Sequence, residues 1–402
     1  MKTVDAFLSK RIPRYLLGIA AFALIAGCAE QPTVYSKDKA AATRNLGALA
    51  YLDNTQEALQ AYRRATQLDP GNADGWNQLG HLLTRVGDLD AAIAAYNTVL
   101  ALGEKHNDRQ EIAAAYGNLG VVYKTRGDLD KAIEFLQKAL KLMEALGSKE
   151  GMANNYGNLG NVYQTRGDLD KAIEYYQKAL KLDEDLGRKE GMANAYGNLG
   201  NVYQTRGDLD KAIEYYQKAL KLNEDLGRKE GMAEDYNNLG VVYQTRGELD
   251  KAIEFHQKAL KLAEELGSKE GMARGYGNLG VVYQTRGDLD KAIEFHQKAL
   301  KLNEDLGRKE GMANQYGNLG IVYRTRGELD KAIEFHQKAL KLDEALGSKE
   351  GMANNYANLG VAYKLKGNKT EAKRYFLMSI KLFKQIGSPK EKSVQTWLDA
   401  LQ

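Results

Sequence analysis

The sequence predicts an all-α fold in which about nine antiparallel helix pairs stack into a solenoid that ends in a C-terminal capping helix. One observation is an aromatic residue that recurs every 40 residues, and another is a Leu-Gly dipeptide three residues after each of them. A third is that blocks 156–195 and 196–235 differ at only three positions. Such regularity indicates one supersecondary unit copied along the chain. The recurring aromatic residues are Trp76, Tyr116, Tyr156, Tyr196, Tyr236, Tyr276, Tyr316 and Tyr356.

The chain begins with a basic segment that is followed by an apolar run. Four Lys and Arg residues lie within the first 14 positions, and residues 15–26 are uninterrupted by a charge. Twelve helical residues rise about 18 Å, which is too little for a hydrocarbon core of about 30 Å. Residues 1–27 are therefore predicted to be a signal peptide and not a membrane span.

The apolar run ends in LIAGC at residues 24–28, which resembles the lipobox of bacterial lipoproteins. The resemblance implies cleavage before Cys28, acylation of its thiol by palmitate or a similar chain, and acylation of the new N-terminus. Ala29, where Asp would favour the inner membrane, implies the periplasmic face of the outer membrane if the source is Gram-negative. Residues 28–42 would then be a lipidated polar tether. An ordinary signal peptide with a chance cysteine is the alternative.

The repeats occupy residues 43–388. Their units start near positions 43, 76, 116, 156, 196, 236, 276, 316 and 356, and the first unit is shorter, at 33 residues. Each unit is predicted to form two helices that cannot bury their apolar faces alone, so successive pairs must stack into one continuous core.

The unit at position 156 illustrates the predicted helices. The first spans roughly residues 149–166, with Leu159, Gly160 and Tyr163 on one face. Gly167 then ends this helix in the left-handed conformation, and Asp168 caps the next. Ala172, Ile173, Ala179 and Leu186 belong to the apolar stripe predicted for the second helix. Glu248 and Glu328 occupy the cap position in two later units.

The motif Y-x-x-L-G-x-x-Y that begins at Tyr156, together with Ala172 and Ala179, resembles the tetratricopeptide repeat. Its 40-residue length departs from the usual period of about 34 and is similar to the repeats of kinesin light chains, spindle-orientation adaptors and Rap-type regulators. The resemblance implies a right-handed superhelix whose first helices line a concave surface. Residues 389–402 leave the repeat pattern and predict the capping helix.

Uncharged amides gather on one arc of the first helices, opposite the apolar stripe. Asn and Gly weaken a helix by roughly 0.5–1 kcal/mol each, and an amide can pair with the backbone of an extended peptide. Kinesin light chains, which these repeats resemble, use an asparagine ladder in this place. Alternatively, the asparagines bond to the neighbouring first helix and serve stacking. The predicted peptide-binding residues are Asn118, Asn158, Asn198, Asn238, Asn278, Asn318, Asn358, Asn161, Asn201, Gln164 and Gln204.

The copies differ along this arc. Val241, Val281 and Ile321 take the position that Asn161 and Asn201 hold in earlier units. The C-terminal half of the arc is therefore more apolar, which predicts a ligand with an apolar segment towards the C-terminal units.

Two further periodic sets are assigned to structure. His256, His296 and His336 stand 40 residues apart, and stacking would separate them by about 10 Å, too far to share a metal. We expect them to be half-buried packing residues. The second set lies in the last turns of first helices, where cations suit the helix dipole. Its members are Arg126, Arg166, Arg206, Arg246, Arg286 and Arg326.

Charge and composition restrict the remaining functions. A formal net charge of +4 over 402 residues gives no electrostatic footprint for nucleic acid. Cys28 is the only cysteine, which excludes an internal disulfide and a Cys-based zinc site. The sequence contains no catalytic triad, metal-ligand grouping or phosphate loop. No catalytic residue, metal, cofactor or small-molecule substrate is therefore predicted.

Together these features predict a membrane-anchored scaffold, not an enzyme, that binds an extended peptide or a partner protein. Two alternatives remain open. Nearly identical units could stack between molecules, which would make the chain a self-associating structural envelope protein. By analogy with Rap-type regulators, it could instead regulate a partner enzyme.

Overall fold

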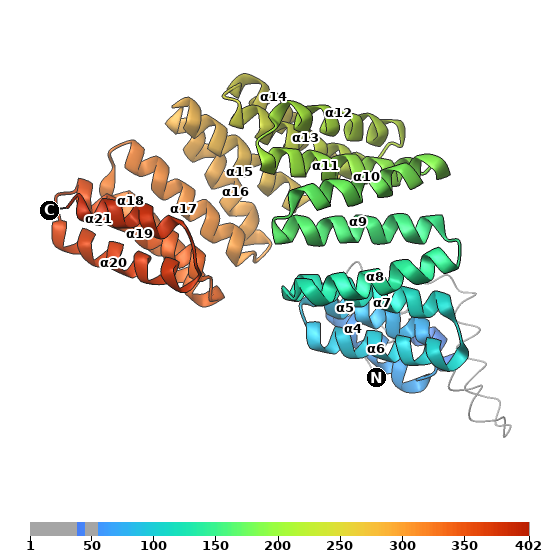
Figure 1. The fold of residues 1–402 in the computed structure, drawn as a ribbon. Helices are drawn as coiled ribbons and strands as arrows, with labels where there is room; N and C mark the ends of the chain where they lie inside the picture. Colours follow the sequence, from blue (N-terminus) through green and yellow to red (C-terminus); the bar gives the residue numbers. More distant parts are fainter. Residues whose placement is uncertain (1–37, 45–54, 402) are drawn as a thin grey trace, which may run out of the picture. The chain divides into compact units, whose positions relative to one another are not determined.

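The computed structural model describes residues 38–44 and 55–401 (Figure 1). The predicted signal peptide, Cys28, most of the predicted tether and most of the first helix predicted for the unit at position 43 lie outside the described residues. Within the described residues all regular secondary structure is helical, as the sequence predicts.

The helices follow the predicted two-per-unit order. They are α4 (Thr55–Leu68), α5 (Ala73–Val86), α6 (Leu89–His106), α7 (Arg109–Arg126), α8 (Leu129–Ala145), α9 (Lys149–Arg166), α10 (Leu169–Leu186), α11 (Lys189–Arg206), α12 (Leu209–Asp225), α13 (Lys229–Thr245), α14 (Leu249–Glu265), α15 (Lys269–Arg286), α16 (Leu289–Asp305), α17 (Lys309–Thr325), α18 (Leu329–Leu346), α19 (Lys349–Leu365), α20 (Lys369–Gln385) and α21 (Lys390–Asp399). Odd-numbered helices from α5 to α19 are called first helices below, and even-numbered helices from α4 to α20 are called second helices.

The chain forms two compact units, residues 1–158 and 159–402, which divide within α9. In both units a first helix packs on its own second helix, as α7 does on α8 and α11 on α12, and the second helix packs on the next first helix. First helices also touch the next first helix, α5 with α7 in one unit and α11 with α13 in the other. Second helices approach one another less closely, so each stack is tighter along its first helices.

Glycines end most helices in the left-handed conformation that the sequence predicts. At Gly207 φ is 84°, and the N–H groups of Gly207 and Asp208 bond back to the last turn of α11. The cap prediction is confirmed for Asp208, whose carboxylate accepts a hydrogen bond from the backbone N–H of Lys211. It is wrong for Glu248 and Glu328, which make no such bond. Their longer side chains instead form ion pairs, as Glu248 does with Lys251.

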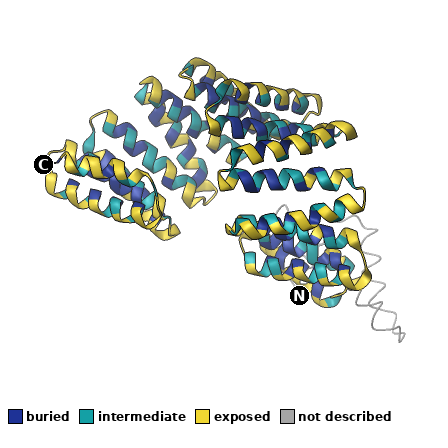
Figure 2. Ribbon diagram, in the orientation of Figure 1, coloured by how far each residue is buried: buried dark blue, intermediate teal, exposed yellow. Residues whose placement is uncertain are grey.

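The buried stripe of the second helices is mostly the predicted one. Ala172, Ile173 and Ala179 are buried, and the residues turned towards neighbouring helices are the buried ones throughout the described chain (Figure 2). Leu186 is an exception, because 42% of it is exposed. The equivalent leucines of other units, Leu146, Leu226, Leu306 and Leu346, are exposed to a similar extent.

The predicted C-terminal cap is confirmed. α21 packs on α20, where Val394 and Leu401 are buried with Phe376 and Phe383. Lys390 donates to the side chains of Glu350 and Asn354 at the start of α19. The cap therefore begins where the next first helix of the repeat would begin.

Two glycines of α11 allow a matched test of this packing. A Cβ at Gly200 would stand 2.6 Å from the ring of Tyr216, whereas a Cβ at Gly197 would have nothing within 4 Å. We expect Gly200→Ala to lower the free energy of unfolding by about 1–3 kcal/mol through overpacking. Gly197→Ala should raise it by about 0.5–1 kcal/mol through helix propensity. Urea unfolding measures both changes, and equal effects would contradict the assigned contact.

Candidate functional site

Each second helix from α6 to α20 places one bulky side chain against the glycine of the Leu-Gly dipeptide on its own first helix. Tyr216 is fully buried in this position, and its ring lies where a side chain at Gly200 would have to be. In other units the corresponding side chain is an aromatic ring, a histidine or a leucine. The pairs of glycine and second-helix residue are Gly80 with Tyr96, Gly120 with Leu136, Gly160 with Tyr176, Gly240 with His256, Gly280 with His296, Gly320 with His336 and Gly360 with Phe376.

The buried tyrosines engage four of the predicted peptide-binding amides. The hydroxyl of Tyr216 lies 2.6 Å from Oδ1 of Asn201 and 2.8 Å from Oε1 of Gln204. The hydroxyl of Tyr176 lies 2.7 Å from Asn161 and 2.9 Å from Gln164 in the same way. Burial raises the pKa of both phenols above the ordinary value, so they stay neutral donors. These amides therefore hold a buried hydroxyl within their own unit.

The histidine units have no such hydroxyl, and their first helices carry Val or Ile in place of asparagine. His256, His296 and His336 are fully buried, so the expectation of half-buried rings is wrong. Each ring packs against a glycine of its own first helix, which has no side chain to hold the ring away from the core. Among the described residues Nδ1 of each ring lies 2.9–3.4 Å from one amide oxygen, and Nε2 has no partner. Burial lowers the pKa of His256 and His336 to about 4, which keeps both rings neutral at pH 7.

The two positions covary along the chain, and sequence analysis missed this signal. A polar residue stands on the first helix wherever tyrosine stands fifteen residues later, as at Asn161 with Tyr176 and at His81 with Tyr96, whose rings meet edge to face. An aliphatic residue stands there when the partner is histidine, leucine or phenylalanine. The aliphatic cases are Val121 with Leu136, Val241 with His256, Val281 with His296, Ile321 with His336 and Val361 with Phe376.

The seven ladder asparagines, one on each first helix from α7 to α19, are all half-buried. Asn118 donates to Asn77 at 2.8 Å, and Asn278 lies 3.3 Å from Asn237, each on the preceding first helix. Asn358 accepts from Arg324 at 3.2 Å. These three serve contacts between neighbouring helices, whereas Asn158 lies at the boundary of the first compact unit.

Three other ladder asparagines are not used in this way. Across the described part of the chain, the side chains of Asn198, Asn238 and Asn318 have no hydrogen-bond partner, although each is half-buried. A half-buried amide without a partner keeps its donors and acceptor available to a ligand. The first-helix face, meaning the exposed and half-buried side chains of α11, α13, α15, α17 and α19 around these asparagines, is the candidate site. Whether the whole ladder binds a ligand stays a prediction.

The arginine set forms ion pairs between units, a role that the sequence analysis did not predict; the predicted favourable interaction with the helix dipole stays a prediction. Arg206 pairs with Asp170 at 2.9 Å, and Arg246 pairs with Asp210 at 2.7 Å. Each pair joins the end of a first helix to the start of the second helix one unit earlier. The remaining pairs of this kind are Arg126 with Asp90, Arg286 with Asp250, Arg326 with Asp290 and Lys366 with Asp330.

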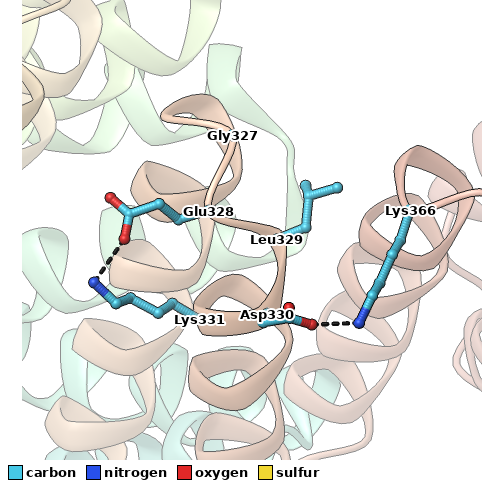
Figure 3. Close-up of a pocket in the computed structure, with 6 residues that line it drawn as sticks. All are labelled: Gly327, Glu328, Leu329, Asp330, Lys331 and Lys366. Atoms are coloured by element: carbon cyan, nitrogen blue, oxygen red, sulfur yellow. Dashed lines mark hydrogen bonds and ion pairs between the residues drawn. The ribbon is translucent and has the colours of Figure 1, made fainter.

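A hollow of about 450 Å³ opens to solvent beside the ion pair between Asp330 and Lys366 (Figure 3). Its charges are satisfied in pairs, because Lys366 bonds to Asp330 and Lys331 bonds to Glu328. The hydrogen bond from Lys331 lowers the pKa of Glu328 below its ordinary value, so this carboxylate stays ionised and paired. The residues that line it are Gly327, Glu328, Leu329, Asp330, Lys331 and Lys366.

A buried acid that the sequence did not reveal lies between α12 and α13. Asp235 is 4% exposed and accepts a 2.7 Å hydrogen bond from Asn223. Burial raises its pKa to about 7. The described residues contain no group of three His, Cys, Asp or Glu side chains arranged to bind a metal ion. No described helix is long and apolar enough to cross a bilayer.

Comparison with known proteins identifies the repeats. The profile of the tetratricopeptide repeat matches residues 72–145, 151–225, 232–305 and 311–385, and a second profile, described as TPR repeat, matches residues 48–87. A search of curated protein sequences finds no match.

Several solved structures share the fold at low sequence identity. A signal transduction ATPase with numerous domains from Pyrococcus horikoshii, which has a tetratricopeptide repeat sensor, aligns with a TM-score of 0.63 and 18% identity over 94% of this chain and 56% of its own. The quorum sensor NprR from B. thuringiensis aligns with a TM-score of 0.60 and 18% identity over 86% of this chain and 98% of its own. Aspartyl phosphate phosphatase F from Bacillus subtilis aligns with a TM-score of 0.57 and 14% identity over 89% of this chain and 96% of its own. At these identities the likeness shows the fold alone.

The tyrosine–asparagine pairing predicts a compensating pair of substitutions. Asn201→Val leaves the buried hydroxyl of Tyr216 with Gln204 alone, so the free energy of unfolding should fall by about 1–3 kcal/mol. Removing that hydroxyl as well, in Asn201→Val/Tyr216→Phe, should restore most of the loss. Denaturant unfolding of both variants measures the coupling, and purely additive effects would argue against the bond.

The buried histidines predict acid sensitivity. In the unfolded chain the rings of His256 and His336 bind a proton below about pH 6.5, but in the folded protein they do so only near pH 4. Their contribution to stability is therefore complete above pH 6.5 and is lost as the pH falls towards 4. Between pH 7 and pH 5 the loss should be on the order of 2 kcal/mol for each ring.

The control replaces all three rings by phenylalanine, the residue that Phe376 supplies at the same position. The raised pKa of Asp235 has the opposite effect, since an acid that binds its proton more tightly when folded loses stability as the pH rises. Asp235 is present in both proteins, so its effect cancels. Urea unfolding at several pH values should show a smaller acid loss in the triple variant, and parallel curves would contradict the assignment.

Proposed function

We propose, from the premise that the chain belongs to the tetratricopeptide repeat family, that it is a protein-interaction scaffold whose first-helix face binds an extended segment of a partner protein. The half-buried, unpartnered amides of Asn198, Asn238 and Asn318 carry the proposal. They recur on alternate or adjacent first helices of the second compact unit. An extended backbone offers donors and acceptors along its length that these amides can satisfy whatever the side chains are.

The packing of the helix pairs supports this location. The opposite surface, on the second helices, is occupied by its own contacts, because Lys218 pairs with Glu214 and lies over the ring of Tyr215. Tyr203 stacks on Tyr215, and Lys211 lies over the ring of Tyr203.

On the first helices the ion pairs lie in the first or last turn, as at Glu190 and Arg206, and the described middle turns around the free asparagines have none. α21 packs on α20, where a further helix pair would otherwise stack, which favours a monomeric scaffold over end-to-end assembly.

We further propose that the scaffold is exported and tethered to a membrane through acylated Cys28. Two or more acyl chains anchor a protein firmly at about 0.8 kcal/mol per buried methylene, whereas one chain binds only marginally. The lipobox-like residues 24–28 carry this proposal. Such a tether would present the first-helix face at an envelope surface, where it would bind its partner without catalysing a reaction.

Replacing the free amides tests binding separately from folding. A random peptide display library of about 12 residues, enough to span several first helices, is selected on the full chain. Asn198→Ala/Asn238→Ala should weaken the binding of the selected peptides by about 1 kcal/mol for each asparagine replaced. The free energy of unfolding should change by less than about 0.5 kcal/mol.

Asn201→Ala is the matched control, since it removes an amide that holds Tyr216. It should destabilise the fold through the lost bond. If the double variant loses stability to the same extent, the two asparagines serve stacking and the proposed role is wrong.

The proposed lipid anchor is tested by replacing the sulfur atom of Cys28 with oxygen. Cys28→Ser should abolish incorporation of a labelled palmitate analogue and move the chain from the detergent-rich to the aqueous phase in detergent partitioning. Retained labelling or unchanged partitioning would refute lipidation at Cys28 and leave the peptide-binding proposal unaffected.

A further inference from the structure

Arg324, in the last turn of α17, is a half-buried cation without an acidic partner among the described residues. Its guanidinium donates one hydrogen bond, to the neutral amide of Asn358 at 3.2 Å on the next first helix. Burial lowers its pKa below the ordinary value. Removing a cation from water without a counter-charge is costly, and a guanidinium has five N–H donors in a fork that suits a carboxylate. Most of these donors are unused.

A second cation stands at the same position one unit later. Lys364 is exposed and forms no ion pair within the described residues. Four earlier units carry glutamine at this position, and two of those glutamines hold buried tyrosines. The other two are Gln244 and Gln284. Lys124 of α7 also has a cation at this position. Within α11 to α19, which form the first-helix face, the change from amide to cation in the last two units concentrates positive charge at one end.

The short cap leaves this end open. α21 starts beside the first turn of α19 but has ten residues, whereas α19 has seventeen. The last turns of α19 are therefore uncovered, and Leu365 is 59% exposed. Every earlier first helix from α7 onward has threonine in that place. An apolar residue thus stands next to the free cation of Lys364.

These residues form one patch. α17 and α19 are in direct contact, and residues three or four apart on a helix share a face. Ile321 is on the face of Arg324, and Val361 is on the face of Lys364 and Leu365. We define the C-terminal patch as Ile321, Arg324, Asn358, Val361, Lys364 and Leu365.

We propose that the C-terminal patch binds a glutamate or aspartate side chain, flanked by apolar residues, within the extended partner segment. Arg324 and Lys364 receive the carboxylate, and Ile321, Val361 and Leu365 contact the neighbouring apolar side chains. The first-helix face continues on both sides of Arg324, onto α15 and onto α19, so the bound chain continues past the acid. The acid is therefore a side chain and not a terminal carboxylate.

This inference rests on the proposed function, and its test separates the two. Peptides displayed without a free C-terminus are selected on the full chain in detergent, on Arg324→Gln/Lys364→Gln and on Lys301→Gln/Lys341→Gln. The first variant carries glutamine, the residue of earlier units, at both positions, so it should fold. The second removes the same charge from exposed positions on second helices and serves as the matched control.

The wild type and the control should select peptides enriched in Glu or Asp beside apolar residues, and the Arg324→Gln/Lys364→Gln variant should lose that enrichment. Changing Glu to Gln in a selected peptide should weaken binding to the wild type at least tenfold, as for a charge-assisted hydrogen bond, and have little effect on the variant.

Selected peptides without an acidic preference, yet dependent on Asn198 and Asn238, would overturn this inference and leave the proposed function standing. Selection of nothing by the wild type would overturn both. Binding of anionic vesicles that is lost in Arg324→Gln/Lys364→Gln, without an acidic preference among peptides, would also overturn it and assign the patch to lipid.

Discussion

The contact between a second-helix side chain and the glycine of the Leu-Gly dipeptide fixes how the two helices of each pair approach. At Gly200 the ring of Tyr216 occupies the space that any Cβ would need. Because the same contact recurs from Gly80 to Gly360, the pairs have nearly the same internal geometry and can stack without a change of register. The glycine thus weakens the first helix locally, and burial of a large ring compensates for it.

The chemistry of that buried side chain determines which residue the first helix can carry beside it. A tyrosine brings a hydroxyl into the core, and a buried hydroxyl needs a hydrogen-bond partner. The side chains of Asn161 and Asn201 therefore bond to tyrosine hydroxyls of their own units. Where the ring is histidine or phenylalanine, an aliphatic residue suffices, and the first-helix face becomes more apolar for a reason of packing. Val241, Val281 and Ile321 need no ligand to explain them, although they still shape the surface that a ligand would meet.

The parts of the structure that depend on neighbouring residues in the sequence could be predicted from it. The 40-residue period gave the helix pairs, the bounds of α9, the glycine helix ends and the cap, because periodicity, capping and termination are local. What failed depends on contacts between helices. Leu186 has the right period but is 42% exposed. Glu248, whose side chain is one methylene longer than that of Asp, makes no cap bond.

The candidate site shows the same limit. The sequence predicts a stripe of amides but cannot tell which are engaged, since the partners lie fifteen residues away, as at Tyr216, or on another unit, as at Arg324. It gave no sign of the Asp235–Asn223 pair, which two substitutions between nearly identical copies create. The covariation between the two helices of a pair is present in the sequence. It can be interpreted only when the second-helix side chain is known to pack against the glycine of the Leu-Gly dipeptide.

The most direct test transplants the tyrosine arrangement into a histidine unit. His256→Tyr places a hydroxyl beside Val241, and adding Val241→Asn supplies the missing partner next to Gln244. The coupling between the two substitutions in the free energy of unfolding, from a double-mutant cycle, is the quantity to measure. If the buried ring dictates its neighbour on the first helix, the coupling should be favourable by about 1 kcal/mol or more. A coupling near zero would mean that the ring does not dictate the composition of the first-helix face.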